Sequence, residues 1–316
     1  MKIKILPLFL VIPLTACQQN PALESKVFCF DTVVESKLYE GSKTDLDEVK
    51  KIFNFYSDIS DNYEAKNITN IYTINQTNEE IEIDPKLYDL LKVSFEVKNE
   101  GATYFNPLCG SLAKKWKESL KNQQILAENE KNSEILKINS SSLTFKNDYK
   151  IQRLGEAEID LGGIVKGYAL DMAKNYLDSV SINHFLLNAG SSSTMLGEKN
   201  NKDGLFSVGL KDLPNYYLKL KNCVISTSGT SVQGVVIDGI TYSHIINPIT
   251  GSAINNYDAV VVISEQGYFG DALSTSMMMN TVDEIKAIEQ EHDVKTIVIK
   301  DQKIIYKNDG IEVYHR

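Results

Sequence analysis

The chain has 316 residues, and its 42% hydrophobic content is that of a globular protein and not of a disordered one. Its formal net charge is −9 and its isoelectric point lies near 5.1, which excludes nucleic acid binding driven by neutralisation of phosphates. An acidic chain that binds an anionic ligand needs local hydrogen-bond donors or a metal ion at the binding site.

The first residues, MKIKILPLFLVIPLTAC, follow the plan of a signal peptide. Lys2 and Lys4 form a short basic start, and an apolar run over 5–14 follows it. This run is too short to span a bilayer as a permanent helix. Its end, LTAC, resembles the lipobox of bacterial lipoproteins, which implies cleavage after Ala16 and lipid attachment to Cys17. The alternative is an ordinary secretory signal with an incidental cysteine.

The predicted organisation is a signal peptide over 1–16, a lipidated cysteine and polar tether over 17–26, and one compact domain over 27–316. Without its signal the chain has 31 basic against 42 acidic residues, so we expect it to lie at a membrane through its lipid and not through charge. The other cysteines are too widely spaced for a metal-binding pattern and allow at most one disulfide. They are Cys29, Cys109 and Cys223.

Hydrophobic periodicity predicts helices and strands that interleave without a regular βαβ rhythm. Helices are expected over 45–60, 85–99 and 110–120, with Asp84 capping the second and Trp116 on the apolar face of the third. Strands are expected over 143–146, 150–153, 184–188, 206–211, 217–226, 234–237, 240–246, 258–264 and 294–300. This order favours a mixed α+β fold, with mainly antiparallel sheets and flanking helices, over a doubly wound sheet.

A glycine turn stands between a strand-like run and a helix in EIDLGGIVKGYALD, residues 158–171. Gly162 and Gly163 allow a close backbone approach, and the helix that follows is expected to present unpaired amides at its first turn. Lys166 adds a positive charge one turn into the helix. The segment therefore predicts an anion site suited to phosphate, although a structural helix cap is the alternative. Asp160 is either a cap or a ligand contact.

The stretch YSHIINPITG, residues 242–251, is read as a strand that carries His244 and stops at Asn247-Pro248. Histidine is the side chain best suited to move protons near neutral pH, although a lone histidine is often structural.

The third stretch, GDALSTSMMMN, spans residues 270–280 and is predicted to run from a loop into a helix. Asp271, Ser274 and Thr275 share one face of a helical turn because they are three and four residues apart. One carboxylate with neighbouring neutral oxygens suits Mg²⁺, which prefers oxygen ligands and keeps waters or substrate phosphates. An N-cap aspartate with its hydroxyls bonded to the backbone is the alternative.

Together the three stretches resemble the ApbE family, the FAD:protein FMN transferases. DLGGIVKGYALD, HIINPITG and DALSTSMMM are similar to the three specific family motifs and occur in the family's order. Weaker similarity extends over nearly the whole of 27–316 and includes LLNAGSSS and VISTSGTSVQ. The resemblance implies an ApbE-like, T-fold-related single catalytic unit.

The resemblance also implies an activity and a set of site residues. Family members bind FAD with Mg²⁺ and transfer its FMN half to a threonine hydroxyl of a target protein, releasing AMP. By motif position the metal ligands are the Gly163 carbonyl, Asp271 and Thr275, with Ser274 beside them. Contacts to FAD are implied for these residues: Asp160, Lys166, the main chain of Ile245, Asn188, Ala189, Gly190, Ser228 and Gly229. For the base that activates the threonine, Asp271 or His244 is the hypothesis.

Several positions depart from the family pattern. Asn247 and Asn106 stand where the family has aspartate, and NAGSSS lacks a glycine and an acid of the usual segment. A Mg²⁺-dependent FAD pyrophosphatase giving FMN and AMP therefore stays an alternative, as does a non-catalytic FAD-binding lipoprotein. In each case we expect an extracytoplasmic, membrane-anchored protein. For the transferase, the partner is a target protein on the same side of the membrane.

Overall fold

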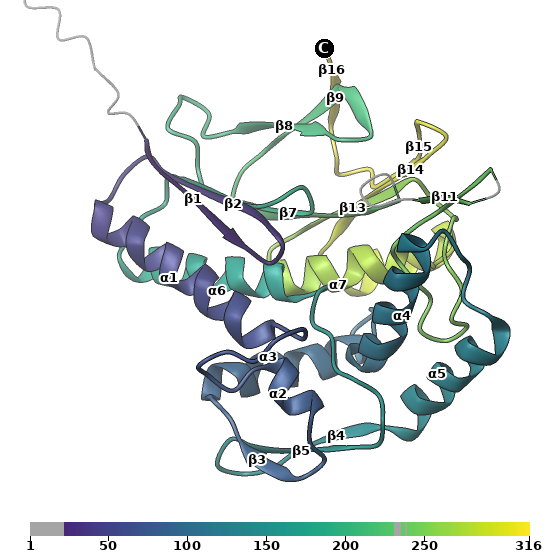
Figure 1. Ribbon diagram of the computed structural model, residues 1–316. Helices are drawn as coiled ribbons and strands as arrows, with labels where there is room; N and C mark the ends of the chain where they lie inside the picture. The colour runs from purple at the N-terminus through teal and green to yellow at the C-terminus, as the bar shows by residue number, and fades with distance from the viewer. Residues whose placement is uncertain (1–21, 231–234, 238) are drawn as a thin grey trace, which may run out of the picture.

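The computed structural model describes residues 22–230, 235–237 and 239–316 (Figure 1). The predicted signal peptide and Cys17 lie outside these residues. Eight helices are found in this part of the chain: α1 (Lys43–Ser60), α2 (Ile71–Asn75), α3 (Pro85–Glu96), α4 (Gly110–Lys121), α5 (Glu128–Ser140), α6 (Val165–Ser179), α7 (Gly267–Met277) and α8 (Val282–Glu291). Two short 3₁₀ helices, η1 (Val97–Asn99) and η2 (Pro107–Cys109), join them.

A central sheet of eight strands organises the molecule, in the order β1-β2-β6-β7-β10-β13-β14-β15. All of its neighbouring strands pair antiparallel. The strands are β1 (Leu23–Cys29), β2 (Thr32–Leu38), β6 (Phe185–Ala189), β7 (Ser193–Leu196), β10 (Cys223–Gly229), β13 (Ala259–Ser264), β14 (Lys295–Lys300) and β15 (Lys303–Lys307).

Three smaller sheets accompany the central one. The sheet β16-β9-β8 lies over one face of the central sheet, and the sheet β3-β5-β4 lies at the far end of the helical region (Figure 1). A two-stranded ribbon, β11-β12, completes the set. Their strands are β3 (Glu80–Glu82), β4 (Ser142–Phe145), β5 (Lys150–Leu154), β8 (Phe206–Leu210), β9 (Leu213–Leu220), β11 (Val235–Ile237), β12 (Ile240–Tyr242) and β16 (Val313–His315).

The two faces of the central sheet belong to two separate hydrophobic cores. On one face α1, α6 and α7 pack against the strands (Figure 1), and the inward side chains, such as Val34, Leu187 and Val262, join the larger core. On the other face Ile225 and Val261 join a smaller core under β8 and β9. Alternation of side chains along each strand produces this division. Consecutive residues of one strand therefore serve different sides of the sheet.

Helices α6 and α7 cross at a pair of glycines, where their backbones touch. A Cβ atom added to Gly167 would lie 2.0 Å from the carbonyl oxygen of Gly267, and one added to Gly267 would lie 2.4 Å from that of Gly167. No larger residue can keep these helices at this separation.

At the same crossing, each helix has an aspartate that accepts backbone amides at the start of the other helix. The carboxylate of Asp171, on α6, accepts the backbone amides of Gly267 (2.7 Å) and Tyr268 (2.9 Å) at the start of α7. The carboxylate of Asp271, on α7, accepts the amide of Gly167 (2.7 Å) near the start of α6. Each helix therefore provides an anion for the positive N-terminal region of the other. Both helices carry the same short pattern, GYALD and GYFGD.

Most of the predicted elements are confirmed, with five corrections. The strand-like run before the glycine turn forms no strand, and the segment predicted to run from a loop into a helix is helical from Gly267 onward. The predicted tether over 17–26 is wrong from Leu23 onward, because those residues alternate in burial and pair with β2. The predicted strand over 217–226 is two strands, β9 and β10, separated by a turn at Asn222, whose φ is 51°. The predicted strand over 240–246 ends at Tyr242.

Some elements were not predicted from the sequence. They include the edge hairpin of β1 and β2 and the helices α2, α5 and α8. The strand pairings β14-β15 and β9-β16 were also not predicted, because they form only when the chain folds. Within the described ranges, no helix has both the length and the apolar character needed to cross a bilayer.

The glycine crossing gives a stability prediction. We expect Gly167→Ala to destabilise the protein by about 1–3 kcal/mol or more, because the added methyl group meets backbone atoms that cannot move aside. Alanine gains up to about 1 kcal/mol of helix propensity, which offsets part of this loss. The measurement is chemical denaturation followed by circular dichroism.

Gly209→Ala, on β8, is the matched control, because a Cβ atom there meets nothing within 4 Å. Equal unfolding free energies for the two variants would show that the backbone contact is not the constraint described above.

Candidate active site

The segment before α6 is held in place by backbone and side-chain hydrogen bonds. The Asp160 carboxylate accepts the Gly162 amide (2.6 Å) and the Asn62 side-chain amide (2.8 Å). The Asp160 amide donates to the Pro107 carbonyl (2.8 Å). Asp160 is therefore a turn-forming residue at a partly exposed position, and one of its oxygens reaches a second segment of the chain.

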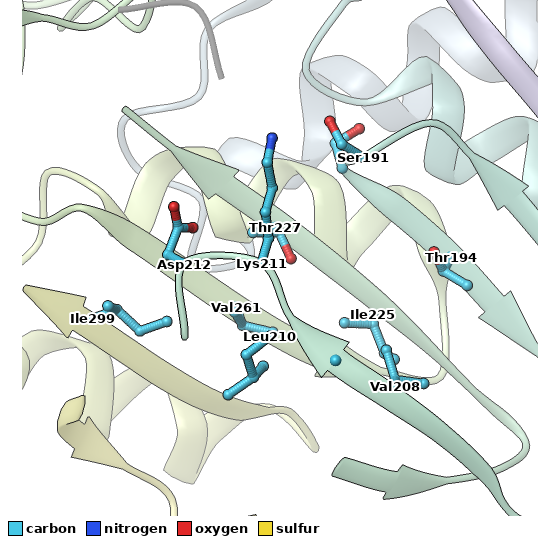
Figure 2. A pocket seen from close by; sticks show the side chains of 12 residues that line it. Ser191, Thr194, Val208, Leu210, Lys211, Asp212, Ile225, Thr227, Val261 and Ile299 are labelled. Carbon is cyan, nitrogen blue, oxygen red and sulfur yellow. The ribbon is translucent and has the colours of Figure 1, made fainter. Parts of the chain in front are cut away.

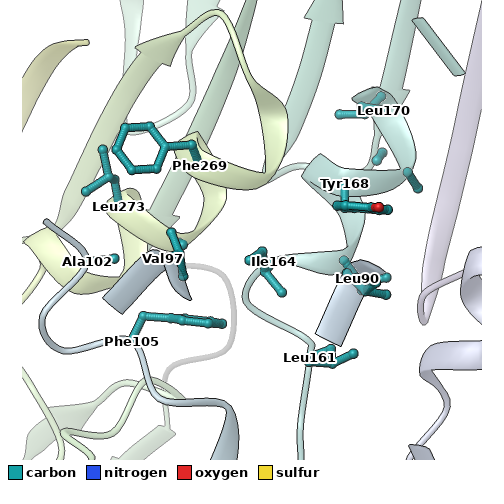
Figure 3. Close-up of a cluster of buried hydrophobic side chains, with 14 of the residues drawn as sticks. Leu90, Val97, Ala102, Phe105, Leu161, Ile164, Tyr168, Leu170, Phe269 and Leu273 are labelled. Carbon is teal, nitrogen blue, oxygen red and sulfur yellow. The ribbon is translucent and has the colours of Figure 1, made fainter. Parts of the chain in front are cut away.

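Buried apolar side chains flank the glycine turn, which lies between Leu161 and Ile164 (Figure 3). Phe105, Leu161 and Ile164 are buried there, beside Phe269 and Leu273 of α7. A Cβ atom on Gly163 would lie 3.1 Å from the ring of Phe105 and 3.6 Å from the Thr275 hydroxyl. Gly163 therefore lies next to Thr275, as the sequence motifs predict for two ligands of one metal ion.

Asp271 is a buried carboxylate surrounded by hydrogen-bond donors. Asp271 is 6% exposed. It lies in the second turn of α7, so it is not the N-cap of that helix. Its Oδ1 accepts the hydroxyls of Ser193 (2.7 Å) and Ser226 (2.6 Å), while its Oδ2 accepts the Gly167 amide (2.7 Å). Burial raises the pKa of this carboxyl group, and the positive charge of Lys166 and these donors oppose the rise.

A cluster of hydroxyls lies one turn further along α7. The Ser228 hydroxyl lies 3.0 Å from that of Ser274 and 3.2 Å from that of Thr275. Both α7 hydroxyls also donate to the Asp271 carbonyl, at 3.0 and 3.2 Å. Ser274 is 2% exposed, whereas Thr275 is partly exposed beside Gly163. Thr275 is thus the better placed of the two to bind a ligand.

The predicted anion site at the start of α6 is corrected by this geometry. The amide of Gly167, which the sequence left for a phosphate, donates to the Asp271 carboxylate. The Val165 and Tyr168 amides donate to the carbonyls of Leu161 and Ile164. The Gly167 donor is occupied because α7 brings its carboxylate to the helix start, whereas the other two amides make local backbone hydrogen bonds. These three amides are therefore not available to an anionic ligand, and Lys166 is the positive side chain that remains at this place.

The oxygen atoms present fit a Mg²⁺ ion. No cluster of three or more His, Cys, Asp or Glu side chains suited to a metal exists among the described residues. The candidate ligands are one carboxylate, one hydroxyl and one carbonyl: Asp271, Thr275 and Gly163. Such a set leaves positions for water or phosphate oxygens, which is how Mg²⁺ is usually bound. A buried carboxylate whose pKa is raised by burial is also a place where a cation is electrostatically favoured.

His244 lies in a segment anchored by a buried tryptophan. The indole of Trp116, 1% exposed, donates to the Ser243 carbonyl (2.9 Å), and the Ser243 hydroxyl accepts the Ile245 amide (3.0 Å). The predicted main-chain contact of Ile245 to FAD would therefore involve its carbonyl and not its amide.

The His244 ring is exposed, but the protein around it still removes enough water to disfavour its charged form. This desolvation, together with the positive charges of Lys166 and Lys117, lowers the pKa of His244 to about 4. His244 is therefore neutral at pH 7 and able to accept a proton. The electrostatic effect of Lys166 on both His244 and Asp271 places the three side chains in one region.

The predicted flavin-side residues are only partly brought together. Ser228 and Gly229 lie on β10 beside α7 and β13. Ala189 faces the larger core, and Gly190 packs against Thr32 with a φ of 77°. Asn188 is on the other face of the sheet, because its neighbours Leu187 and Ala189 face the larger core. Its buried Oδ1 has no hydrogen-bond partner.

Asn62, which the motifs did not predict, contacts Asp160, and a chain of contacts leads from it to Lys114 and Tyr63. Asn62 donates to the Asp160 carboxylate, and Lys114 donates to the Asn62 carbonyl (2.6 Å) while pairing with Glu158 (2.8 Å). Tyr63 is 54% exposed, with the Lys114 and Lys117 ammonium groups 5.1 and 5.2 Å from its ring centre. In the sequence, the one feature that could have pointed to this group was the aromatic residue Tyr63 directly after Asn62. Lys117 and Lys166 both act electrostatically on His244.

A cavity of about 80 Å³ lies on the opposite face of the central sheet (Figure 2). Its walls include Thr194, Thr227, Ile225 and Val261, and Lys211 stands at its edge. Thr227 belongs to the same strand as Ser226 but points the other way. This cavity is therefore separated from Asp271 by the thickness of the sheet and is not the candidate active site.

The fold is shared with solved flavin transferase structures. The chain superimposes on an ApbE protein from Thermotoga maritima with a TM-score of 0.75 and 22% identity, covering 93% of this chain and 96% of that one. It superimposes on a flavin transferase ApbE from Vibrio cholerae with a TM-score of 0.71 and 21% identity, covering 93% and 97%. These similarities establish the α+β architecture with antiparallel sheets.

Sequence comparison gives the family. The profile of the ApbE family matches residues 30–298, and the chain belongs to this family. A Chlamydia muridarum protein named FAD:protein FMN transferase is 25% identical over 251 residues, which cover 77% of this chain and 78% of that protein. A protein of the same name from Klebsiella pneumoniae is 32% identical over 157 residues, covering 47% and 48%.

The environment of His244 gives a titration prediction. We expect its imidazole signal in a proton NMR titration to stay that of the neutral ring from pH 8 to about pH 5.5, with a midpoint near 4. The unfolded chain takes up this proton near pH 6.5, so the residue costs stability as pH falls from about 6.5 to 4.

His244→Gln assigns the signal and should lose less unfolding free energy than the wild type over that pH interval. A midpoint near 6.5 would contradict the desolvated environment described above.

Proposed function

We propose that this chain is an FAD:protein FMN transferase that moves FMN from FAD to a threonine hydroxyl of a target protein and releases AMP. The observation that carries the proposal is the buried Asp271 of α7, which meets the start of α6 beside Gly163 and Thr275. A carboxylate, a hydroxyl and a carbonyl at this end of the crossing, with the positive charge of Lys166 acting on Asp271, support a site for a metal-bound diphosphate. The names of the similar proteins agree with this chemistry.

In this proposal Asp271, Thr275 and the Gly163 carbonyl hold a Mg²⁺ ion, with Ser274 and Ser228 supporting Thr275. When bound, Mg²⁺ offsets the charge of the diphosphate and makes its phosphorus more open to attack. Lys166 contributes a second positive charge, and the ammonium groups of Lys117 and Lys114 lie beside the ring of Tyr63. Phosphoryl-type transfer needs little more than positioning and charge stabilisation.

His244 is the better candidate for the base. Both oxygens of Asp271 already accept hydrogen bonds, whereas the His244 ring is exposed and neutral at pH 7. A ring whose pKa is near 4 is a weak base. However, the negative charge of bound FAD opposes the effect of Lys166 and Lys117, so substrate binding should raise the pKa towards neutrality.

We further propose that the protein acts outside the cytoplasm, held at a membrane by lipid on Cys17. The support is the sequence pattern of a basic start, an apolar run and LTAC. The target would then be an extracytoplasmic protein that presents a threonine in an accessible segment. Hydrolysis of FAD to FMN and AMP is the second candidate activity, because water can replace threonine at an open acceptor site.

The first test of this proposal is a transfer assay. The purified chain is mixed with FAD, Mg²⁺ and a flavoprotein segment that carries an acceptor threonine, and the segment is followed by intact-mass spectrometry. We expect a mass gain of one FMN with release of AMP. Asp271→Ala or a chelator should abolish both, because the cation loses its carboxylate or is removed.

Asp178→Ala is the control, since this exposed carboxylate of α6 pairs with Lys174 on the surface of the helix. Release of AMP without a mass gain would support the pyrophosphatase instead. Intact FAD bound to the wild type would support a storage protein.

A second test concerns the base. At saturating FAD and Mg²⁺, we expect His244→Ala to lower kcat by roughly 10²-fold or more, the usual loss when a positioned base is removed. His315→Ala, on β16, should leave kcat unchanged. An unchanged kcat in His244→Ala would rule out this residue as the base.

A further inference from the structure

The two oxygens of Asp271 are not equivalent. Oδ1 accepts two hydrogen bonds, from the hydroxyls of Ser193 (2.7 Å) and Ser226 (2.6 Å). Oδ2 accepts one, from the Gly167 amide (2.7 Å). Because a carboxylate oxygen has about two lone-pair directions, Oδ1 is fully used while Oδ2 retains one.

The two serines are fixed by the sheet. Ser193 on β7 and Ser226 on β10 are direct cross-strand partners, and they are 1% and 0% exposed. The helix above them is equally fixed, since a Cβ atom on Gly270 would lie 2.9 Å from the Ser226 hydroxyl and 2.5 Å from that of Ser264. The close packing at Gly270 therefore holds the backbone of α7, and with it the backbone of Asp271, against the serine pair.

The unused lone pair of the Asp271 carboxylate is on the oxygen nearer α6. Oδ2 is the atom that contacts Gly167, four residues after Gly163. The Thr275 hydroxyl lies near Gly163 as well. The free lone pair of Oδ2, the Gly163 carbonyl and the Thr275 hydroxyl therefore lie at the same end of the α6-α7 crossing.

We propose that Ser193 and Ser226 restrict Asp271 to binding a cation through Oδ2 alone, and so select Mg²⁺ over Ca²⁺. The inference rests on the proposed function for the metal site itself. Mg²⁺ requires a compact octahedral shell and accepts single carboxylate oxygens. Ca²⁺ takes six to eight oxygens and often binds both oxygens of one carboxylate. The serine pair denies Ca²⁺ that second oxygen.

The test measures cation binding and not turnover. Mg²⁺ alone and Ca²⁺ alone are titrated calorimetrically into the wild-type chain and into Ser193→Ala/Ser226→Ala. We expect the wild type to bind Mg²⁺ more tightly than Ca²⁺. In the double variant Oδ1 becomes available, and the ratio of the Ca²⁺ Kd to the Mg²⁺ Kd should fall on the order of tenfold or more, the usual scale for groups that orient a metal ligand.

The matched control is Thr194→Ala/Thr227→Ala. These threonines follow the two serines on the same strands but point into the cavity on the opposite face (Figure 2). The control removes two hydroxyls from β7 and β10 without touching Asp271, so its Kd ratio should equal that of the wild type. A fall of the same size in the control would overturn the inference.

The other possible results also decide whether the serine pair selects Mg²⁺ over Ca²⁺. An unchanged ratio in the serine variant, with Mg²⁺ still bound by the wild type, overturns the inference and leaves the proposed metal site standing. A wild type that binds neither cation overturns both. If the double variant does not fold, Ser193→Ala and Ser226→Ala are measured separately, because each frees one direction on Oδ1 and should lower the ratio by part of the full effect.

Discussion

Two helices approach each other so closely in this protein that their backbones touch, and the contact is possible only because Gly167 and Gly267 have no side chains. At this separation each helix can supply a carboxylate to the start of the other, Asp171 in one direction and Asp271 in the other. The candidate active site is a product of this crossing. If the helices were further apart, Asp271 would lose the Gly167 amide and its position beside the glycine turn.

The crossing also explains how an acidic chain can offer a site for an anionic ligand. The helix amide that would bind a phosphate is already bonded to Asp271, so the protein holds a carboxylate where an isolated helix would hold the ligand itself. In the proposed function, a cation at Asp271 would reverse the sign of the charge presented to the ligand. Lys166 and Lys117 add positive charge nearby, and the same charges help to keep His244 neutral.

Alternate residues of each strand in the central sheet face opposite sides of the sheet and have different roles. On β10, Ser226 and Ser228 face α7 and contact site residues, while Thr227 lies on the side of the smaller core. A strand register shifted by one residue would exchange these roles and remove both hydroxyls from the site. The register of β7 and β10 is therefore a requirement of the site as well as of the fold.

Much of the architecture could be predicted from local patterns. The helices that became α1, α3 and α4 carried clear periodicity, Asp84 caps α3 as predicted, and the buried position of Trp116 followed from its helix face. Asp271 and Thr275 were identified from their spacing. The β1-β2 hairpin could not be predicted, because a polar edge strand resembles a tether until a partner pairs with it.

What the sequence by itself determined was the family, the order of the elements and the residue types able to hold a metal ion. These depend on contacts within a few residues along the chain, where spacing and propensity suffice. Only the tertiary structure decided that the α6 amide serves Asp271, that Ser193 and Ser226 share one of its oxygens, and that Asn188 faces the other side of the sheet. The physical reason is that hydrogen-bond partners far apart in sequence are chosen by the packing of helices and strands, which no local pattern records.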